Sequence, residues 1–343
     1  MNDRDAAPKR TRRPTMVDVA RSAGVSVKTV SRVVNGVSTV DPALRERVGL
    51  AMRELGFRRN SVAANLRSGR STATIGLIIL DLANPFYSTI AAAAARVAQR
   101  FDTQLFTASS GWDAQRETEL AMDLCQRRVD GLIIVPTGED QSYLRAETDQ
   151  GTPVVFVDRP PTGIEGDAVL IDNRGGARTA VQRLLTEGHD RIGIVTDSLN
   201  SWTMSERLAG AREELEAAGV ADRARFVETP SDAPGVAGDA VARMLGEASP
   251  PTAILCGNNR ILSGAVGEVV RRGARVRLAG FDDFEFAHLL PYPVTVVGYD
   301  TASLGRFAAE LLFRRIREPE ISFSSTIVAT YLVDRGIAAA APC

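Results

Sequence analysis

The chain has 343 residues, of which 44% are hydrophobic, so it is long enough for a small module and a larger one. It has no apolar run of about 18 residues and no apolar stretch in its polar start, so neither a membrane span nor a secretion signal is expected. Three widely spaced cysteines and two histidines exclude a disulfide framework and a structural zinc site. These features favour a cytoplasmic protein without a metal ion or a cofactor.

The net charge of −1 conceals a strong division along the chain. Residues 1–70 hold 15 Lys and Arg against 6 Asp and Glu, a net charge of +9, and the remainder carries −10. Such asymmetry indicates a basic module that binds a polyanion, attached to an acidic body. A solvated basic tail is the alternative explanation. We expect a disordered basic tail over residues 1–14.

Residues 15–35 predict two short helices joined by a tight turn. Thr15 and Ser26 are placed to cap the two helices, and Gly24 between them permits the turn. Both segments have apolar residues at helical spacing: Val17, Val19, Ala20 and Ala23 in the first, and Val27, Val30, Val33 and Val34 in the second. A third helix is expected at about Pro42–Leu55. This pattern is typical of a helix-turn-helix, whose second helix enters the DNA major groove, although an ordinary helical hairpin has a similar pattern.

Helical geometry divides the second helix into a buried face and an exposed face. Val30, Val33 and Val34 are expected to point inward. The exposed residues at the start and middle of the helix can reach base edges: Val27, Lys28 and Arg32. Arg32 can donate two hydrogen bonds to guanine. Short polar side chains nearby suit phosphate oxygens: Thr15, Ser26, Thr29, Ser31 and Asn35.

Three motifs in this region are more specific than a generic helix-turn-helix. They are Thr-x-x-Asp-Val-Ala from Thr15, Ala-Gly-Val-Ser from Ala23 and Thr-Val-Ser-Arg-Val-Val-Asn from Thr29. Together they resemble the head of the lactose-repressor (LacI/GalR) family of transcriptional regulators, and the resemblance continues to about Asp334. It implies a helix-turn-helix domain over residues 15–60, a hinge helix and linker over 61–72, and an effector-binding and dimerisation core over 73–343. By this resemblance, Val27, Lys28 and Arg32 match the base-contacting positions.

The resemblance also assigns a role to the segment that follows the head. It implies a hinge helix that enters the minor groove from both subunits of a dimer, with Leu66 as the wedge that inserts at the operator centre. Small Ala63 and Ala64 let two such helices approach closely. A helix of about nine residues is marginal alone in water, so we expect it to form on DNA. A plain linker with an incidental leucine is the alternative.

From residue 73 onward, short apolar stretches alternate with helical patterns such as Tyr87–Arg100. The predicted strands are Ile75–Leu80, Gln104–Thr107, Gly131–Val135, Pro153–Val157, Ala168–Ile171, Arg191–Val195, Thr252–Cys256 and Val276–Gly280. This alternation predicts parallel sheets covered by helices on both faces. The fold class is therefore a small all-α helix-turn-helix head plus an α/β core of two doubly wound lobes, like a periplasmic binding protein. We expect an N-lobe over about 73–172 and 301–325, and a C-lobe over about 173–300 and 326–340.

Ligands of open α/β sheets bind beyond the carboxyl ends of the strands. Polar and aromatic residues follow several strands here, and the resemblance implies effector contacts for some of them: Asn84, Phe86, Tyr87, Arg159, Arg207, Asn258 and Asp282. Rings beside amide, carboxylate and guanidinium groups suit a sugar or a sugar derivative. Cleft-lining ion pairs and core packing of the two rings are the alternatives. Trp202 is either a lid or a surface residue, and His189 is expected to be structural.

The chain departs from the family pattern at several points. Asn258-Asn259 stands where the family usually has Asn-Asp, and Gly138 stands where some sugar binders place a polar contact. The segment between Gly273 and Gly280 is shorter than usual. These departures leave the effector's identity open. No leucine heptad follows Asp334, so a homodimer is expected and not a tail-joined tetramer.

These observations predict a ligand-controlled regulator, most simply a repressor, that binds a palindromic double-stranded DNA operator as a homodimer. A solute-binding protein without a regulatory role and an architectural DNA binder without an effector are the alternatives. An α/β enzyme is disfavoured because the chain lacks GxGxxG after its first strand, a P-loop and a G-x-S-x-G elbow. No catalytic residues are expected.

Overall fold

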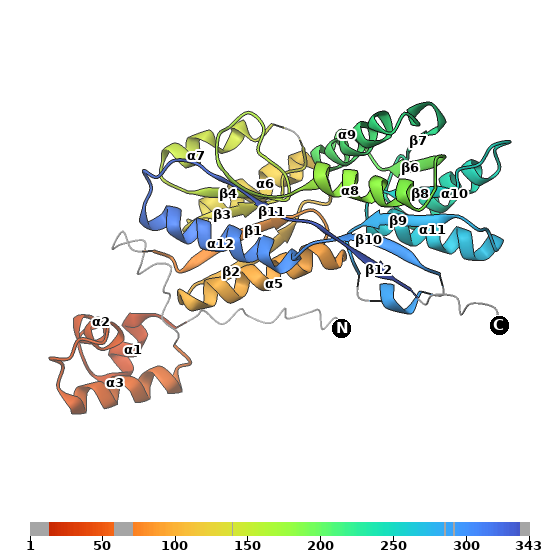
Figure 1. The fold of residues 1–343 in the computed structure, drawn as a ribbon. Coiled ribbons are helices and arrows are strands. Elements are labelled where there is room, and N and C mark those ends of the chain that lie inside the picture. Colours follow the sequence, from red (N-terminus) through yellow and green to blue (C-terminus); the bar gives the residue numbers. More distant parts are fainter. Residues whose placement is uncertain (1–13, 58–70, 139, 285, 291, 337–343) are drawn as a thin grey trace, which may run out of the picture. The chain divides into compact units, whose positions relative to one another are not determined.

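The computed structural model describes residues 14–57, 71–138, 140–284, 286–290 and 292–336. The chain divides into two compact units, residues 1–72 and 73–343 (Figure 1). The expectations for the basic tail and for Ala63, Ala64 and Leu66 of the hinge fall outside the described residues. No described helix is long and apolar enough to cross a membrane.

The first unit holds three helices: α1 (Met16–Ala23), α2 (Val27–Val34) and α3 (Pro42–Glu54). Thr15 forms a capping box with Asp18, in which the Thr15 hydroxyl accepts from the Asp18 backbone N–H and the Thr15 N–H donates to the Asp18 carboxylate at 2.8 Å. Gly24 ends α1 with a φ of +63°, in the left-handed region that glycine adopts without strain.

A small apolar core joins the three helices. Val19 of α1, Val30 of α2 and Val48 of α3 are fully buried in it. Val33 and Val34 pack against this core and are half-buried, as expected for inward-facing residues. Val17 differs from the apolar pattern predicted for the first helix, because it is 52% exposed on the outer side of α1.

The second unit contains two six-stranded sheets, one in each lobe. The N-lobe sheet has the order β11-β5-β4-β3-β1-β2, and its pairings are all parallel. Its strands are β1 (Thr74–Ile79), β2 (Gln104–Ser109), β3 (Leu132–Ile134), β4 (Val154–Val157), β5 (Asp167–Ile171) and β11 (Ser325–Val328). Its helices are α5 (Pro85–Arg100), α6 (Ala114–Gln126), α7 (Arg145–Asp149) and α12 (Thr301–Arg317).

The C-lobe sheet has the order β12-β10-β9-β8-β6-β7, and only β12 runs antiparallel to its neighbour. Its strands are β6 (Ile192–Thr196), β7 (Arg225–Glu228), β8 (Ala253–Cys256), β9 (Arg277–Phe281), β10 (Val294–Gly298) and β12 (Tyr331–Arg335). Its helices are α8 (Asn173–Thr186), α9 (Trp202–Ala217), α10 (Pro234–Leu245) and α11 (Asn259–Arg272).

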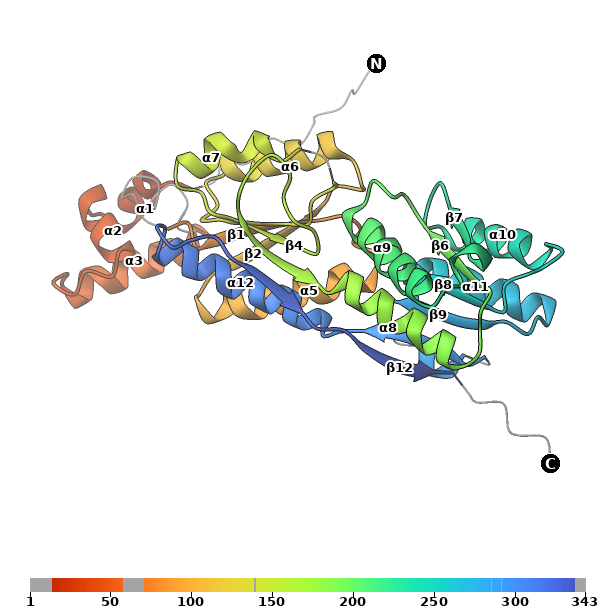
Figure 2. The ribbon, with the colours of Figure 1, turned by 45° about the horizontal axis from the view of Figure 1, so that its top comes forward.

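Helices cover both faces of each sheet. In the N-lobe, α5 and α12 cover one face and α6 and α7 the other (Figure 1). In the C-lobe, α8 and α9 cover one face and α10 and α11 the other (Figure 2). Two glycines permit close helix packing. A Cβ on Gly305 of α12 would lie 2.2 Å from the Ile90 carbonyl oxygen of α5, and a Cβ on Gly210 of α9 would lie 2.2 Å from the Arg174 carbonyl oxygen of α8.

The final lobe boundary lies a few residues beyond the expected position of about 325. Strand β11 continues to Val328 and pairs with β5 of the N-lobe. The chain therefore enters the C-lobe for the last time between β11 and β12. The physical reason is strand pairing, because Ser325 to Val328 complete the edge of the N-lobe sheet.

Candidate functional site

The exposed face of α2 presents the three residues predicted to contact bases. Val27 is 43% exposed, and Lys28 and Arg32 are also exposed, while Val30 on the opposite side of the helix is fully buried. Arg32 Nη2 donates to the Thr39 hydroxyl at 2.8 Å, so its guanidinium is held against the loop after α2. The helix thus offers a cation and an aliphatic side chain on one accessible surface.

The predicted phosphate-contacting residues lie around the ends of α1 and α2. Ser26 caps α2 by accepting from the Thr29 N–H at 3.1 Å, and its hydroxyl is 2.9 Å from that of Thr29. Asn35 ends α2 and donates to the Ser31 hydroxyl at 3.4 Å. The Thr15 hydroxyl donates to Asp18 at 2.6 Å, so it is already used in capping α1.

The carboxyl ends of the strands of both lobes meet around a chamber of about 30 Å³. All seven residues predicted as effector contacts line it: Asn84, Phe86, Tyr87, Arg159, Arg207, Asn258 and Asp282. Asp158, which lies between β4 and Arg159, also lines the chamber. The remaining lining residues were not singled out in the sequence: Trp112, Asp197, Thr203, Met204, Asp232 and Tyr299. A chamber of this size holds little more than water, so the lobes are closed upon each other.

Arg207 is the centre of the C-lobe wall of the chamber. Its Nε donates to Asn173 Oδ1 at 2.7 Å, its Nη1 donates to the Gly257 carbonyl oxygen at 2.5 Å, and its Nη2 donates to Asp282 Oδ1 at 3.2 Å. Its guanidinium also lies 4.0 Å from the Phe281 ring centroid. The Tyr299 hydroxyl donates to the same Asp282 oxygen at 2.5 Å. Burial is the largest single influence on Arg207 and lowers its pKa, but Asp282, Tyr299 and Asp158 together outweigh burial, so that the pKa is raised. Arg207 is therefore a fixed cation whose orientation is set by four neighbours.

Arg159 holds the corresponding place in the N-lobe wall. Its Nη1 donates to the Pro136 carbonyl at 3.2 Å, its Nε lies 3.5 Å from Asp158 Oδ2, and its guanidinium is 4.9 Å from the Trp112 ring centroid. Burial raises the pKa of Asp158, an effect that Arg159 opposes. Asp158 and Asp282 follow β4 and β9 at the same position in the two sheets, and both have left-handed backbones, with φ of +72° and +68°. Such strain in non-glycine residues is concentrated at ligand-binding sites.

Two polar contacts link the lobes beside the chamber. Asn259 Nδ2 of the C-lobe donates to Asn84 Oδ1 of the N-lobe at 3.3 Å. Arg260 reaches Asp81 of the N-lobe at 3.5 Å and Asp232 of the C-lobe at 3.0 Å. Residues from the C-lobe thus hold the first α/β turn of the N-lobe in the closed arrangement.

Among the described residues, four buried side-chain atoms lack a hydrogen bond of ordinary geometry: Thr137 Oγ1, Arg159 Nε, Asn259 Oδ1 and Arg260 Nε. Two of them still have an ion-pair partner, since Arg159 Nε lies 3.5 Å from Asp158 and Arg260 Nε lies 3.0 Å from Asp232. All four belong to residues of the cleft walls or of the interlobe contacts beside them. Buried polar atoms are nearly always hydrogen-bonded, so this concentration indicates a surface built to bind polar groups.

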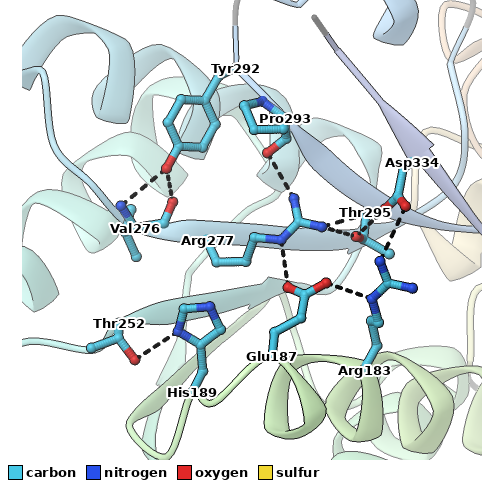
Figure 3. Close-up of polar contacts among 10 residues, drawn as sticks. All are labelled: Arg183, Glu187, His189, Thr252, Val276, Arg277, Tyr292, Pro293, Thr295 and Asp334. Atoms are coloured by element: carbon cyan, nitrogen blue, oxygen red, sulfur yellow. Dashed lines mark hydrogen bonds and ion pairs between the residues drawn. The ribbon is translucent and has the colours of Figure 1, made fainter. Parts of the chain in front are cut away.

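Other residues singled out in the sequence have structural contacts. Trp202, for which a lid and a surface position were both open, is half-buried at the start of α9 and packs on the N-lobe core. His189 Nδ1 lies 3.1 Å from the Thr252 hydroxyl, at the end of the C-lobe sheet opposite to the cleft (Figure 3). In the same region, Arg277 at the start of β9 donates to Glu187 at 2.9 Å, which ties α8 to the sheet.

Comparison with known proteins places both units. Residues 15–60 match the model of the bacterial regulatory proteins of the lacI family, and residues 72–335 match that of the periplasmic binding proteins and sugar-binding domain of the LacI family. The ribose operon repressor of Haemophilus influenzae is 32% identical over 320 residues, which cover 92% of this chain and 95% of the relative.

Solved structures agree with these matches. A lac repressor dimer bound to operator and the anti-inducer ONPF is 28% identical, with a TM-score of 0.79 over 94% of this chain and 98% of the other. A complex of the transcriptional regulator CelR with cellobiose is 29% identical, with a TM-score of 0.68 over the same shares of the two chains. These relatives are transcriptional regulators and not enzymes. With a helix-turn-helix head, a two-lobed α/β core and matches over nearly its whole length, the chain belongs to the LacI family of bacterial regulatory proteins.

Proposed function

We propose that this LacI-family regulator binds a palindromic operator as a homodimer and represses transcription, and that a sugar or sugar derivative in the interlobe cleft controls its DNA binding. The observation that carries the proposal is the joint presence of an exposed, base-accessible α2 face and a polar cleft between two lobes. DNA binding places such a regulator in the cytoplasm.

On the DNA, Val27, Lys28 and Arg32 contact base edges, and the short polar residues around α1 and α2 contact phosphates. The hinge carries Ala63, Ala64 and Leu66, whose proposed minor-groove contacts rest on the sequence alone. A two-fold symmetric dimer presents two heads to two half-sites, which makes the operator a palindrome.

Control by the effector follows from the closed cleft. A chamber of about 30 Å³ does not admit a monosaccharide, so the lobes or their lining side chains move when the effector enters. The effector then stabilises one lobe arrangement by its greater affinity for that arrangement. Because the hinge is joined to the N-lobe, a change in lobe arrangement alters the spacing of the two hinges in the dimer.

The first test is selection of binding sites from a random duplex pool with the full chain, followed by anisotropy titration of the enriched site at several salt concentrations. We expect a palindrome bound far more tightly than a scrambled duplex, with an affinity that falls as salt rises. Weak binding without sequence preference, with and without added sugars, would refute operator recognition and favour an architectural DNA binder.

A further inference from the structure

The cleft carries more negative than positive charge. Its chamber is lined by four aspartates, Asp158, Asp197, Asp232 and Asp282, and by two arginines. Three of the four carboxylates have a cationic partner, because Asp158 lies 3.5 Å from Arg159, Asp282 lies 3.2 Å from Arg207, and Asp232 lies 3.0 Å from Arg260. Among the described residues, no cation forms an ion pair with Asp197.

Asp197 is nevertheless buried. It directly follows β6, is 8% exposed, and accepts one hydrogen bond, from Asn258 Nδ2 at 3.0 Å. Burial raises its pKa to about 6, and the neighbouring Asp232 adds to this effect. A buried carboxylate without a cation is unfavourable, so its position calls for a compensating charge.

The location of Asp197 gives a ligand access to it. It lines both the closed chamber and an adjoining hollow of about 390 Å³. Trp112, which is 45% exposed, and Arg159 also line both spaces. A molecule that enters from the hollow therefore meets Asp197 on its way into the chamber, beside an aromatic ring.

Buried polar atoms in the cleft walls indicate which other groups the ligand carries. Arg159 is 3% exposed, and its Nε forms no hydrogen bond of ordinary geometry, although it lies 3.5 Å from Asp158, so the guanidinium can donate to a ring or hydroxyl oxygen. Thr137 lines the adjoining hollow, and its buried Oγ1 has no partner, which suits a ligand hydroxyl. Arginines balance three of the four aspartates, and Asp197 leaves one negative charge in excess, so the cleft disfavours an anionic ligand.

We propose that the effector is a polyol that bears a protonated amine, with the ammonium group bound by Asp197 and the hydroxyl groups bound by the polar residues of the cleft walls. This inference rests on the proposed control by a cleft-bound effector and specifies its chemical class. A neutral hydroxyl can donate a hydrogen bond to Asp197, but only a cation balances its charge.

The test uses matched probes that differ in one group. D-glucosamine, D-galactosamine and D-mannosamine are each titrated calorimetrically into the full chain at pH 7.5, beside D-glucose, D-galactose, D-mannose, the three N-acetylated amines and D-glucose 6-phosphate. We expect at least one free amine to bind ten or more times tighter than its hydroxyl and N-acetyl counterparts. We expect the phosphate to bind weakest of all.

Two variants locate the preference. Asp197→Asn should remove the advantage of the amine over the hydroxyl probe. Asp283→Asn should preserve it, since Asp283 is exposed and pairs with Arg335 outside the cleft. Equal affinity for amine and hydroxyl, tighter binding of the phosphate, or binding of none of the amines overturns the proposal, whatever the variants do. Operator binding measured on the same samples separates this result from failure of the proposed function, because a selective DNA binder without amine preference refutes only the effector class.

Discussion

Replacing Asp197 with asparagine should stabilise the ligand-free protein at neutral pH. An unfolded aspartate ionises with a pKa near 3.8, whereas burial and Asp232 raise the pKa of Asp197 to about 6 in the fold. Each pKa unit corresponds to about 1.4 kcal/mol, so the ionised carboxylate lowers the free energy of unfolding by about 3 kcal/mol. Asparagine keeps an acceptor for the Asn258 amide and carries no charge.

The pH dependence fixes the sign of this effect. Below about pH 3 the carboxyl is protonated in both the folded and the unfolded chain, so the substitution changes little. Between pH 4 and 6 the folded state holds a proton that the unfolded state has lost, and the stability of the wild type falls as the pH rises. Above pH 6 the full difference of about 3 kcal/mol is present. The charged groups that influence Asp197 are Asp232 and Asp282, which disfavour its ionisation, and Arg159 and Arg207, which favour it.

Urea unfolding followed by tryptophan fluorescence measures this difference, since the chain's two tryptophans, Trp112 and Trp202, both belong to the second unit. With a urea dependence near 3 kcal/mol per molar, the unfolding midpoint of Asp197→Asn should rise by roughly 1 M at pH 7.5 and by no more than roughly 0.2 M near pH 4. Asp283→Asn serves as the control, because it removes a surface ion pair worth at most about 1 kcal/mol. An unchanged or lower midpoint at pH 7.5, or an equal rise at both pH values, would refute the reasoning.

Three further substitutions test other parts of the molecule. Arg32→Ala should weaken binding to the selected operator by about 1–3 kcal/mol and relax base preference at one position, and an equal loss on all duplexes in anisotropy titrations would instead assign Arg32 to a phosphate. Gly305→Ala should lower the melting temperature, because its Cβ would meet a backbone carbonyl of α5 at 2.2 Å, whereas Gly267→Ala, with open space around it on α11, should maintain or raise that temperature. Arg315→Met should destabilise the fold by about 3–5 kcal/mol in urea unfolding, since it leaves Asp167 buried without its partner at 2.8 Å, and a small change would show that Asp167 accepts a proton instead.

The cleft was largely predictable because it obeys a topological rule. Parallel strands of one sheet end at the same edge, so residues that follow separate strands, such as Asn84, Arg159 and Asp282, are brought together by the fold. The same rule could have found Asp197, which directly follows β6. Trp112 lies beyond β2 in a loop where neither spacing nor composition indicated a cleft residue. Asp232 follows β7, whose largely exposed Arg-Phe-Val-Glu sequence carries no apolar signal.

Four strands were not predicted from the sequence: β7, β10, β11 and β12. Buried strands form apolar runs, which predict β1 and β8, and the edge strand β2 was also predicted. The central strand β10 is equally buried and apolar, so the same pattern could have predicted it. At the edges, β11 and β12 have partly exposed, mixed sequences whose identity as strands depends on their partners. The pairing of β11 with β5 sets the lobe boundary near Val328, and the local sequence does not show this tertiary contact.

The charges of the cleft also suggest how a ligand can influence the arrangement of the lobes. In the closed arrangement, Asp158 of the N-lobe lies near Asp282 of the C-lobe. Burial raises the pKa of Asp158 most strongly, and repulsion by Asp282 raises it further. Arg207 attracts Asp158, and Arg260 reaches across to Asp81, so attraction and repulsion act together on the closed state. A ligand shifts the arrangement of the lobes by its greater affinity for one arrangement. Under the proposed effector class, a cation that enters among the carboxylates favours closure and an anion opposes it, so the sign of the ligand's charge lets the cleft distinguish between ligands.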